Sequence, residues 1–225
     1  METIGQTPLG EQVYDRIATA LLTGRMRPND KLTIRGLADQ LGVSSTPVRD
    51  AVKQLTQENV LEHRSPKDVR VPVMSEQTYL EILTIRLSLE GLAAEQAAIN
   101  ASAQQIRDLR RLLDRNEKAI VRRRWAEATQ GNQEFHLALS TLAGMPVLQK
   151  VLRGLWLQMG PLVACYYDTE PGGLNTQHYM LVDALEARDG AAARRAIEAD
   201  ISLARPAMLD QITRLRARHA ADKAA

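Results

Sequence analysis

The sequence predicts a mainly α-helical protein: three helices and a β-hairpin, followed by an all-α bundle of six helices. Three observations support this fold class. Apolar residues recur three and four positions apart along most of the chain, which places them on one face of a helix. Two β-rich runs stand close together before residue 74, and β signals then disappear. The 225 residues are enough for two domains, which we expect at residues 1–74 and 75–225.

Three helices are expected in the N-terminal part. The first covers residues 10–22, where apolar side chains repeat with helical spacing. The second lies within residues 31–42, and the hydroxyl of Thr33 is placed to cap its start. The third begins in the run Ser44-Ser45-Thr46-Pro47, because hydroxyls cap helix starts and proline fits the first turn. It is expected to end near Asn59.

A two-stranded hairpin is expected after these helices. Residues 60–64 and 69–73 are rich in β-formers and flank Ser65-Pro66-Lys67-Asp68, which suits a four-residue loop. The order helix, helix, turn, helix, hairpin is that of a winged helix-turn-helix. We therefore interpret residues 1–74 as a DNA-binding domain.

The rest of the chain is expected to be helical. The predicted helices cover residues 76–100, 103–123, 125–143, 146–168, 175–189 and 190–219. In the last, apolar side chains step by three or four positions from Ala193 to Leu215. Pro161 and Pro206 fall inside two of these segments and are expected to kink or split them.

The composition excludes several classes of protein. A formal net charge of +2 is too small for a protein that coats nucleic acid indiscriminately, so any DNA site must be local. No apolar run is long enough to span a membrane, and the N-terminal residues lack a signal-peptide pattern. Cys165 is the single cysteine, which excludes an internal disulfide and a cysteine-rich zinc module. We expect a cytoplasmic protein.

DNA contacts are expected from the second helix of the helix-turn-helix, which fits the major groove, and from a basic wing. Arg49 can present its guanidinium to a guanine edge or to a phosphate, and nearby hydroxyls can bind either. The predicted DNA-binding residues are Arg35, Ser44, Ser45, Thr46, Arg49, Lys53, Arg64, Lys67 and Arg70. The alternative is a protein-interaction module on which these charges are merely solvated.

The helical part contains a candidate metal site. Asn132 and His136 are four residues apart and therefore face the same way on one helix, while His178 and Asp200 come from two later helices. Imidazole and carboxylate ligands suit zinc, nickel or manganese. The structural alternative is that each of these side chains is hydrogen-bonded or solvated on its own.

Arg86 lies in a broadly apolar stretch, where a buried cation needs a partner. It can clamp the carboxylate of a small organic acid by two hydrogen bonds, or it can pair with Glu90, four residues on. Both alternatives stay open. The candidate effector-binding residues are Arg86, Asn132, His136, His178 and Asp200.

The N-terminal part resembles a known family. The segment LTIRGLADQLGVSSTPVRDAVKQLTQENVLEH is similar to the winged helix-turn-helix of the GntR family, whose motif centres on GVSRTPVREAL. The resemblance implies that Arg35, Thr46 and Arg49 stand at DNA-contacting positions. Ser45 stands where the family usually has arginine, so an operator sequence cannot be carried over. The wing sequence SPKD lacks the usual glycine, which puts its groove contact in doubt.

The C-terminal part is similar to the FadR-type C-terminal (FCD) domain of that family, in the segments TIRLSLEGLAAEQAA, NQEFHLALSTLAGMPVL and QHYMLVDALEARDGAAARRAIEADI. Six helices rather than seven suggest the VanR-like subgroup. Many FCD domains bind a divalent metal through an aspartate and three histidines, with a carboxylate effector at or beside the metal. His136 and His178 align with two of these histidines, Asn132 replaces the aspartate and Asp200 replaces the third histidine.

These features together predict a sequence-specific transcription regulator, a repressor, that binds a pseudo-palindromic double-stranded DNA operator as a homodimer. A small organic acid is expected to control it, through a bound divalent metal where one is present. Two alternatives are a metal-dependent hydrolase in the helical part and the protein-interaction module. No HExxH motif, nucleophile elbow or phosphate loop supports an enzyme.

Overall fold

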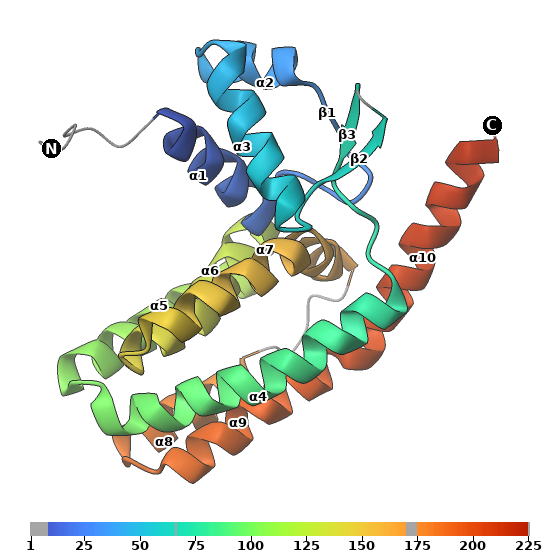
Figure 1. Ribbon diagram of the computed structural model, residues 1–225. Coiled ribbons are helices and arrows are strands. Elements are labelled where there is room, and N and C mark those ends of the chain that lie inside the picture. The colour runs from blue at the N-terminus through green and yellow to red at the C-terminus, as the bar shows by residue number, and fades with distance from the viewer. Residues whose placement is uncertain (1–8, 66, 170–174, 225) are drawn as a thin grey trace, which may run out of the picture.

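The computed structural model describes residues 9–65, 67–169 and 175–224. Figure 1 shows a small N-terminal part lying on a larger group of helices. We call the first part the head; it consists of α1 (Leu9–Leu22), β1 (Lys31–Leu32), α2 (Ile34–Leu41), α3 (Ser45–Gln57), β2 (Glu62–Ser65) and β3 (Asp68–Arg70). We call the helices that follow, α4 to α10, the body. The predicted mainly helical fold with a winged helix-turn-helix is confirmed.

The helix-turn-helix forms as its capping residues predict. The hydroxyl of Thr33 accepts a hydrogen bond from the backbone N–H of Gly36 and so caps α2. Gly42 ends α2 with φ 65°, a left-handed conformation that glycine adopts without steric cost. Ser44 is the N-cap residue of α3, although its side chain makes no capping hydrogen bond.

The wing contains one strand more than the predicted hairpin. Lys31 and Leu32 form β1, which pairs antiparallel with β3, so the strand order is β1-β3-β2. These two residues had been included in the second helical segment, because a strand so short has no alternating pattern to reveal it. The pairing of β2 with β3 is irregular between His63 and Ser65. Pro66, in the predicted loop, lies outside the described residues.

The body consists, in its described part, of seven helices: α4 (Glu76–Asn100), α5 (Ala103–Val121), α6 (Trp125–Leu142), α7 (Pro146–Thr169), α8 (Thr176–Glu186), α9 (Gly190–Leu203) and α10 (Arg205–Ala224). The first five match the predicted segments to within a few residues. The prediction of a single helix over residues 190–219, and hence of six helices, was wrong. Pro206 has no N–H to offer the carbonyl of Ser202, and the helix is interrupted at Ala204. The six helices that suggested the VanR-like subgroup are therefore not found, and membership of that subgroup stays unconfirmed.

The buried side chains form two clusters. One fills the body, where α4 packs on α9 and α6 packs on both α5 and α7. The other fills the head and is made of α1, α2, α3 and the sheet, with the addition of Leu157 from α7. No helix in the described ranges is both long and apolar enough to cross a membrane.

The head rests on α7 of the body, mainly through α1 (Figure 1). Gly160 of α7 lies so close to α1 that a Cβ atom would be 2.8 Å from the carbonyl oxygen of Leu21. A Cβ atom on Gly24, which follows α1 with φ 68°, would overlap Ala164 of α7. Two ion pairs flank this contact, Asp15 with Arg153 and Arg27 with Asp168, each 2.9 Å long. The junction is therefore a close backbone contact rather than a flexible tether.

Substitution of Gly24 tests this contact. We expect Gly24→Ala to lower the free energy of unfolding by about 3 kcal/mol, because it combines a left-handed residue with overlap against Ala164. Gly42→Ala is the matched control, since Gly42 has a similar φ of 65° and no atom near its Cβ position; a loss of about 1 kcal/mol is expected. Urea unfolding measures both, and equal losses would contradict the close contact.

Candidate functional site

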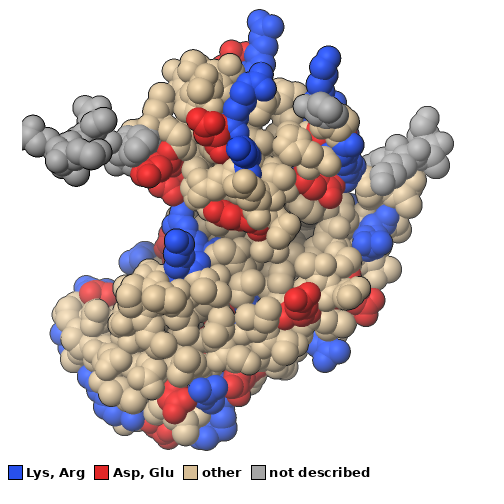
Figure 2. All heavy atoms as spheres, viewed as in Figure 1, with Lys and Arg blue, Asp and Glu red and all other residues tan. Residues whose placement is uncertain are grey.

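Seven of the nine predicted DNA-binding side chains are exposed on the head. They are Arg35 on α2, Ser44 before α3, Ser45, Thr46, Arg49 and Lys53 on α3, and Lys67 before β3. Arg49, Lys53 and Lys67 line one hollow between α3 and the wing. Lys and Arg side chains project from this end of the molecule in Figure 2. A positively charged surface with hydroxyl groups at the start of α3 is suited to a DNA backbone and base edges.

The other two, Arg64 and Arg70, are held within the head. Arg64 Nε lies 2.8 Å from Glu62 Oε1, and Arg70 Nε lies 3.0 Å from Asp68 Oδ1. Both guanidinium groups also donate to Asn29, which has φ 73°. They therefore tie the wing to the loop before β1. An acidic and a basic residue two positions apart lie on the same face of a strand and can pair. Sequence reasoning overlooked this signal.

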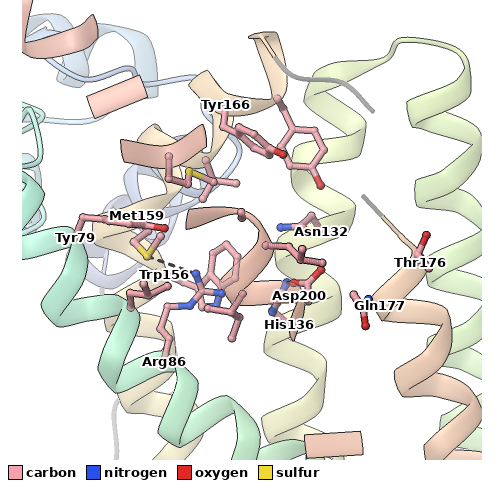
Figure 3. Close-up of a pocket in the computed structure, with 17 residues that line it drawn as sticks. Tyr79, Arg86, Asn132, His136, Trp156, Met159, Tyr166, Thr176, Gln177 and Asp200 are labelled. Carbon is pink, nitrogen blue, oxygen red and sulfur yellow. Dashed lines mark hydrogen bonds and ion pairs between the residues drawn. The ribbon is translucent and has the colours of Figure 1, made fainter. Parts of the chain in front are cut away.

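The body contains a cavity of about 370 Å³ between α4, α6, α7, α8, α9 and α10. Four of the five predicted effector-binding residues line it, namely Arg86, Asn132, His136 and Asp200. In Figure 3, Arg86, Trp156 and Met159 lie on one side and Asn132, His136 and Asp200 on the other. The remaining lining residues are Tyr79, Leu83, Val163, Tyr166, Tyr167, Thr176, Gln177, Ile201, Leu203, Ala204 and Met208.

Three of the predicted metal ligands converge beside this cavity. Asp200 Oδ2 lies 3.4 Å from His136 Nε2, and Asp200 Oδ1 lies 3.2 Å from His178 Nε2. The two Nε2 atoms are 3.3 Å apart. All three ligand atoms lie within 4.8 Å of one another, although the residues come from α6, α8 and α9. Asn132, one turn before His136, lines the adjoining cavity.

Hydrogen bonds on the far side of each imidazole set its orientation. His136 Nδ1 lies 2.6 Å from Glu90 Oε2, and a carboxylate can only accept a hydrogen bond. His178 Nδ1 lies 3.2 Å from Asn175 Oδ1, and that amide is oriented because its nitrogen donates to Glu117. In neutral rings, both Nδ1 atoms then carry the protons and both Nε2 lone pairs point to Asp200.

Two lone pairs and a carboxylate that face one another require a positive charge between them. A shared proton or a divalent cation supplies it, so this donor set fits a metal ion. Burial alone lowers the pKa of His136, but attraction to Glu90 and hydrogen bonding with Asp200 outweigh it, and the pKa is raised. Burial raises the pKa of Asp200, and attraction to His178 and His136 more than reverses this.

Two roles were left open for Arg86, pairing with Glu90 and binding the carboxylate of a ligand. The structure contains the first and leaves room for the second. Its Nε lies 2.5 Å from Glu90 Oε1, so the predicted pairing is present. The guanidinium carbon lies 4.1 Å from the centre of the Trp156 ring, and Nη1 lies 3.5 Å from Met159 Sδ. Arg86 still lines the cavity, where a ligand carboxylate can meet the guanidinium.

Sequence reasoning missed several residues of this site. Glu90 was recognised only as a partner for Arg86, whereas its second oxygen also holds His136. The spacing of Arg86 and Glu90 was the available signal. The aromatic lining residues Tyr79, Trp156, Tyr166 and Tyr167 were not singled out, because aromatic side chains at helical spacing are as typical of a core as of a cavity wall.

Two family patterns match the sequence. Residues 9–71 match "Bacterial regulatory proteins, gntR family", and residues 81–203 match "FCD domain". The "HTH-type transcriptional regulator McbR" of Escherichia coli (strain K12) is 31% identical over 182 residues, which cover 79% of this chain and 82% of that protein. The "Probable D-xylose utilization operon transcriptional repressor" of Paenarthrobacter nicotinovorans is 29% identical over 205 residues, or 90% of this chain and 89% of that protein.

Solved structures resemble the whole fold. E. coli McbR/YncC superimposes with a TM-score of 0.86 at 28% identity and covers 92% of this chain and 99% of its own. A putative GntR transcriptional regulator from Rhodococcus sp. RHA1 gives a TM-score of 0.78 at 20% identity, covering 91% of this chain and 99% of its own. At that identity the second similarity supports the fold alone.

The buried carboxylate of Glu90 provides a prediction about stability. Attraction to Arg86 and His136 outweighs burial and lowers its pKa to about 2, so it is ionised. Glu90→Gln should therefore leave Arg86 buried without a counter-ion and lower the free energy of unfolding by about 3 kcal/mol. Glu95→Gln on the same helix breaks only the half-exposed pair with Arg194, and we expect a loss of about 0.5 kcal/mol. Similar losses in thermal or urea unfolding would argue against a buried charge at Glu90.

Proposed function

Because this chain belongs to the gntR family of bacterial regulatory proteins, with an FCD domain after its winged helix, we propose that it represses transcription by binding an operator as a homodimer. The chain is a DNA-binding transcription regulator and not an enzyme. We further propose that a small organic acid, bound in the body, controls it. We also propose that it acts in the cytoplasm, where a bacterial regulator meets its DNA.

The observation that carries the DNA-binding proposal is the exposed start of α3. Its hydroxyl residues and Arg49 stand beside the wing, where a recognition helix presents its first residues to the major groove. We propose that residues 1–74 form the DNA-binding domain and residues 75–225 the effector domain. The two separate buried clusters support this division.

The homodimer is proposed because one recognition helix reads too short a site for specificity, whereas two related by a twofold axis read a pseudo-palindrome. The long helix α4 offers apolar side chains at its surface, since Ile85 is 37% and Ile99 is 67% exposed. An exposed apolar face on the body is consistent with contact to a second copy. The dimer contact is thereby separate from the DNA-binding surface.

The effector proposal rests on the cavity of the body and on the few polar groups that line it. Arg86 is placed to bind a carboxylate on one side, and Asn132, His136 and Asp200 provide polar groups on the other. His136, His178 and Asp200 would hold a divalent metal, with the Asn132 amide as a further oxygen donor. Such a metal, when bound, supplies a positive charge that attracts a carboxylate oxygen.

The alternatives are less well supported. A hydrolase needs a base and an activated water at the metal, and family membership indicates a regulator instead. A protein-interaction module would use the head without its cations. It therefore predicts that partner binding survives the loss of Arg49.

Selection of duplexes from a random DNA pool tests the DNA-binding proposal. We expect wild-type protein to enrich a short pseudo-palindrome, and Arg49→Ala to bind it with a free energy weaker by about 1 to 3 kcal/mol. Arg107→Ala, which removes the same charge from the exposed surface of α5, should bind as wild type does. An enriched single half-site would contradict the dimer, and no enrichment at moderate salt would contradict sequence-specific binding.

Equilibrium dialysis against zinc, nickel and manganese tests the metal proposal. We expect wild-type protein to retain one ion per chain and Asp200→Asn to bind it at least about tenfold more weakly, because the only anionic ligand is lost. Asp183→Asn is the control, since Asp183 pairs with Arg110 on the surface. Retention of metal by neither protein, or equally by both, would contradict a site at Asp200.

A further inference from the structure

Helix α7 contacts the cavity with one face and the head with another. Leu157 belongs to the head's buried cluster, and Gly160 lies against the end of α1. The side chains of α7 that line the cavity are Trp156, Met159, Val163, Tyr166 and Tyr167. These two sets of residues alternate along the same turns of the helix. Only the width of α7 therefore separates a ligand in the cavity from the head.

Two hydrogen-bond donors of α7 have no partner among the described residues. They are Trp156 Nε1 and the hydroxyl of Tyr167, and their side chains are 1% and 2% exposed. Leaving a buried donor unpaired is unfavourable, and folded proteins rarely do so. Because both residues line the cavity, acceptor atoms located there can satisfy them. Burial is also the main cause of the raised pKa of Tyr167, so its hydroxyl keeps its proton and remains a donor.

α7 also reaches the recognition helix. Gln158 Nε2 donates to the backbone oxygen of Glu58, the C-cap residue of α3, at 3.3 Å. The carboxylate of Glu58 in turn accepts a 2.6 Å hydrogen bond from the hydroxyl of Tyr14 on α1. Pro161 follows in α7 and has no N–H for the carbonyl of Leu157, which makes this the point where α7 bends most easily.

We propose that Trp156 and Tyr167 bind oxygen atoms of the effector, and that α7 thereby transmits effector binding to the head through Gln158 and Gly160. This inference rests on the proposed acid effector and adds the α7 residues that would bind it. We expect the effector to carry oxygen acceptors besides the carboxylate that Arg86 holds, because Trp156 and Tyr167 add two further donors to the cavity wall. Movement of α7 must displace α1, since the contact at Gly160 leaves no free space.

The first experiment measures binding of acids to the full chain. Butyrate, malate and citrate are titrated while the melting temperature is followed, and we expect the two oxygen-rich acids to raise it more than butyrate. Tyr167→Phe should melt near the wild-type temperature without acid, because its hydroxyl has no partner to lose among the residues that the structure describes. It should bind the best acid about three- to tenfold more weakly, as expected for one lost hydrogen bond, and Trp156→Phe should also weaken it.

The matched control is Tyr179→Phe, whose hydroxyl bonds to Asp114 outside the cavity and whose acid binding should equal that of wild type. Unchanged acid binding in both Tyr167→Phe and Trp156→Phe would overturn the assignment of the α7 donors. If no acid raises the melting temperature of wild-type protein, the proposed acid effector is wrong and this inference falls with it. The two failures are therefore distinguishable.

The second experiment measures transmission, with the duplex recovered from the random pool and fluorescence anisotropy as the readout. In Gln158→Ala, which loses the bond to Glu58, we expect acid to bind as in wild type but to change operator affinity by a smaller factor. The control is Gln149→Ala at the start of α7, whose side chain bonds to Thr141 within the body. An acid response in Gln158→Ala equal to that of wild type would overturn α7 as the transmitting element.

Discussion

The interior of the body is organised around one carboxylate. Glu90 is completely buried, and each of its oxygens binds a different cation-forming side chain, Arg86 on its own helix and His136 on α6. A buried charge is tolerated only when its partners are held in place. The pairing therefore fixes how α4 and α6 face each other. Arg86, held by Glu90, lies over the ring of Trp156 on α7. The same pairing therefore also positions α7, the helix on which the head rests.

Much of the fold follows from local patterns, and the parts that do not follow depend on distant partners. Thr33 and Gly42 stand at the two ends of α2, where the predicted segment 31–42 placed its cap and its end, because capping is decided within one turn. β1 was not foreseen, since Lys31 and Leu32 become a strand only by pairing with β3. The break at Ala204 was a weighed alternative, and Pro206 alone could not decide between a kink and an interruption.

The site was predictable to a similar extent. Helical spacing places Asn132 and His136 on one face of α6, and a helical bundle can bring His178 and Asp200 to the same interior point. Periodicity does not say which helices pack together, so resemblance to the FCD domain was needed to strengthen this grouping. The hydrogen-bond chain from Glu117 through Asn175 to His178 joins α5 to α8 and has no sequence signature. Arg64 and Arg70 were predicted to contact DNA, although acidic neighbours two residues away had the spacing to bind them.

The internal pairing of the wing arginines affects how the head responds to salt. A protein bound to DNA releases condensed counterions in proportion to the phosphates that its cations neutralise, and this release sets the salt dependence of the affinity. Arg64 and Arg70 already share their charge with Glu62 and Asp68, and both are tied to Asn29. If the head binds DNA as proposed, fewer counterions should be displaced than the number of its basic residues implies. In the proposed mode of DNA binding, operator affinity would then depend more on groove contacts of α3, which added salt screens less.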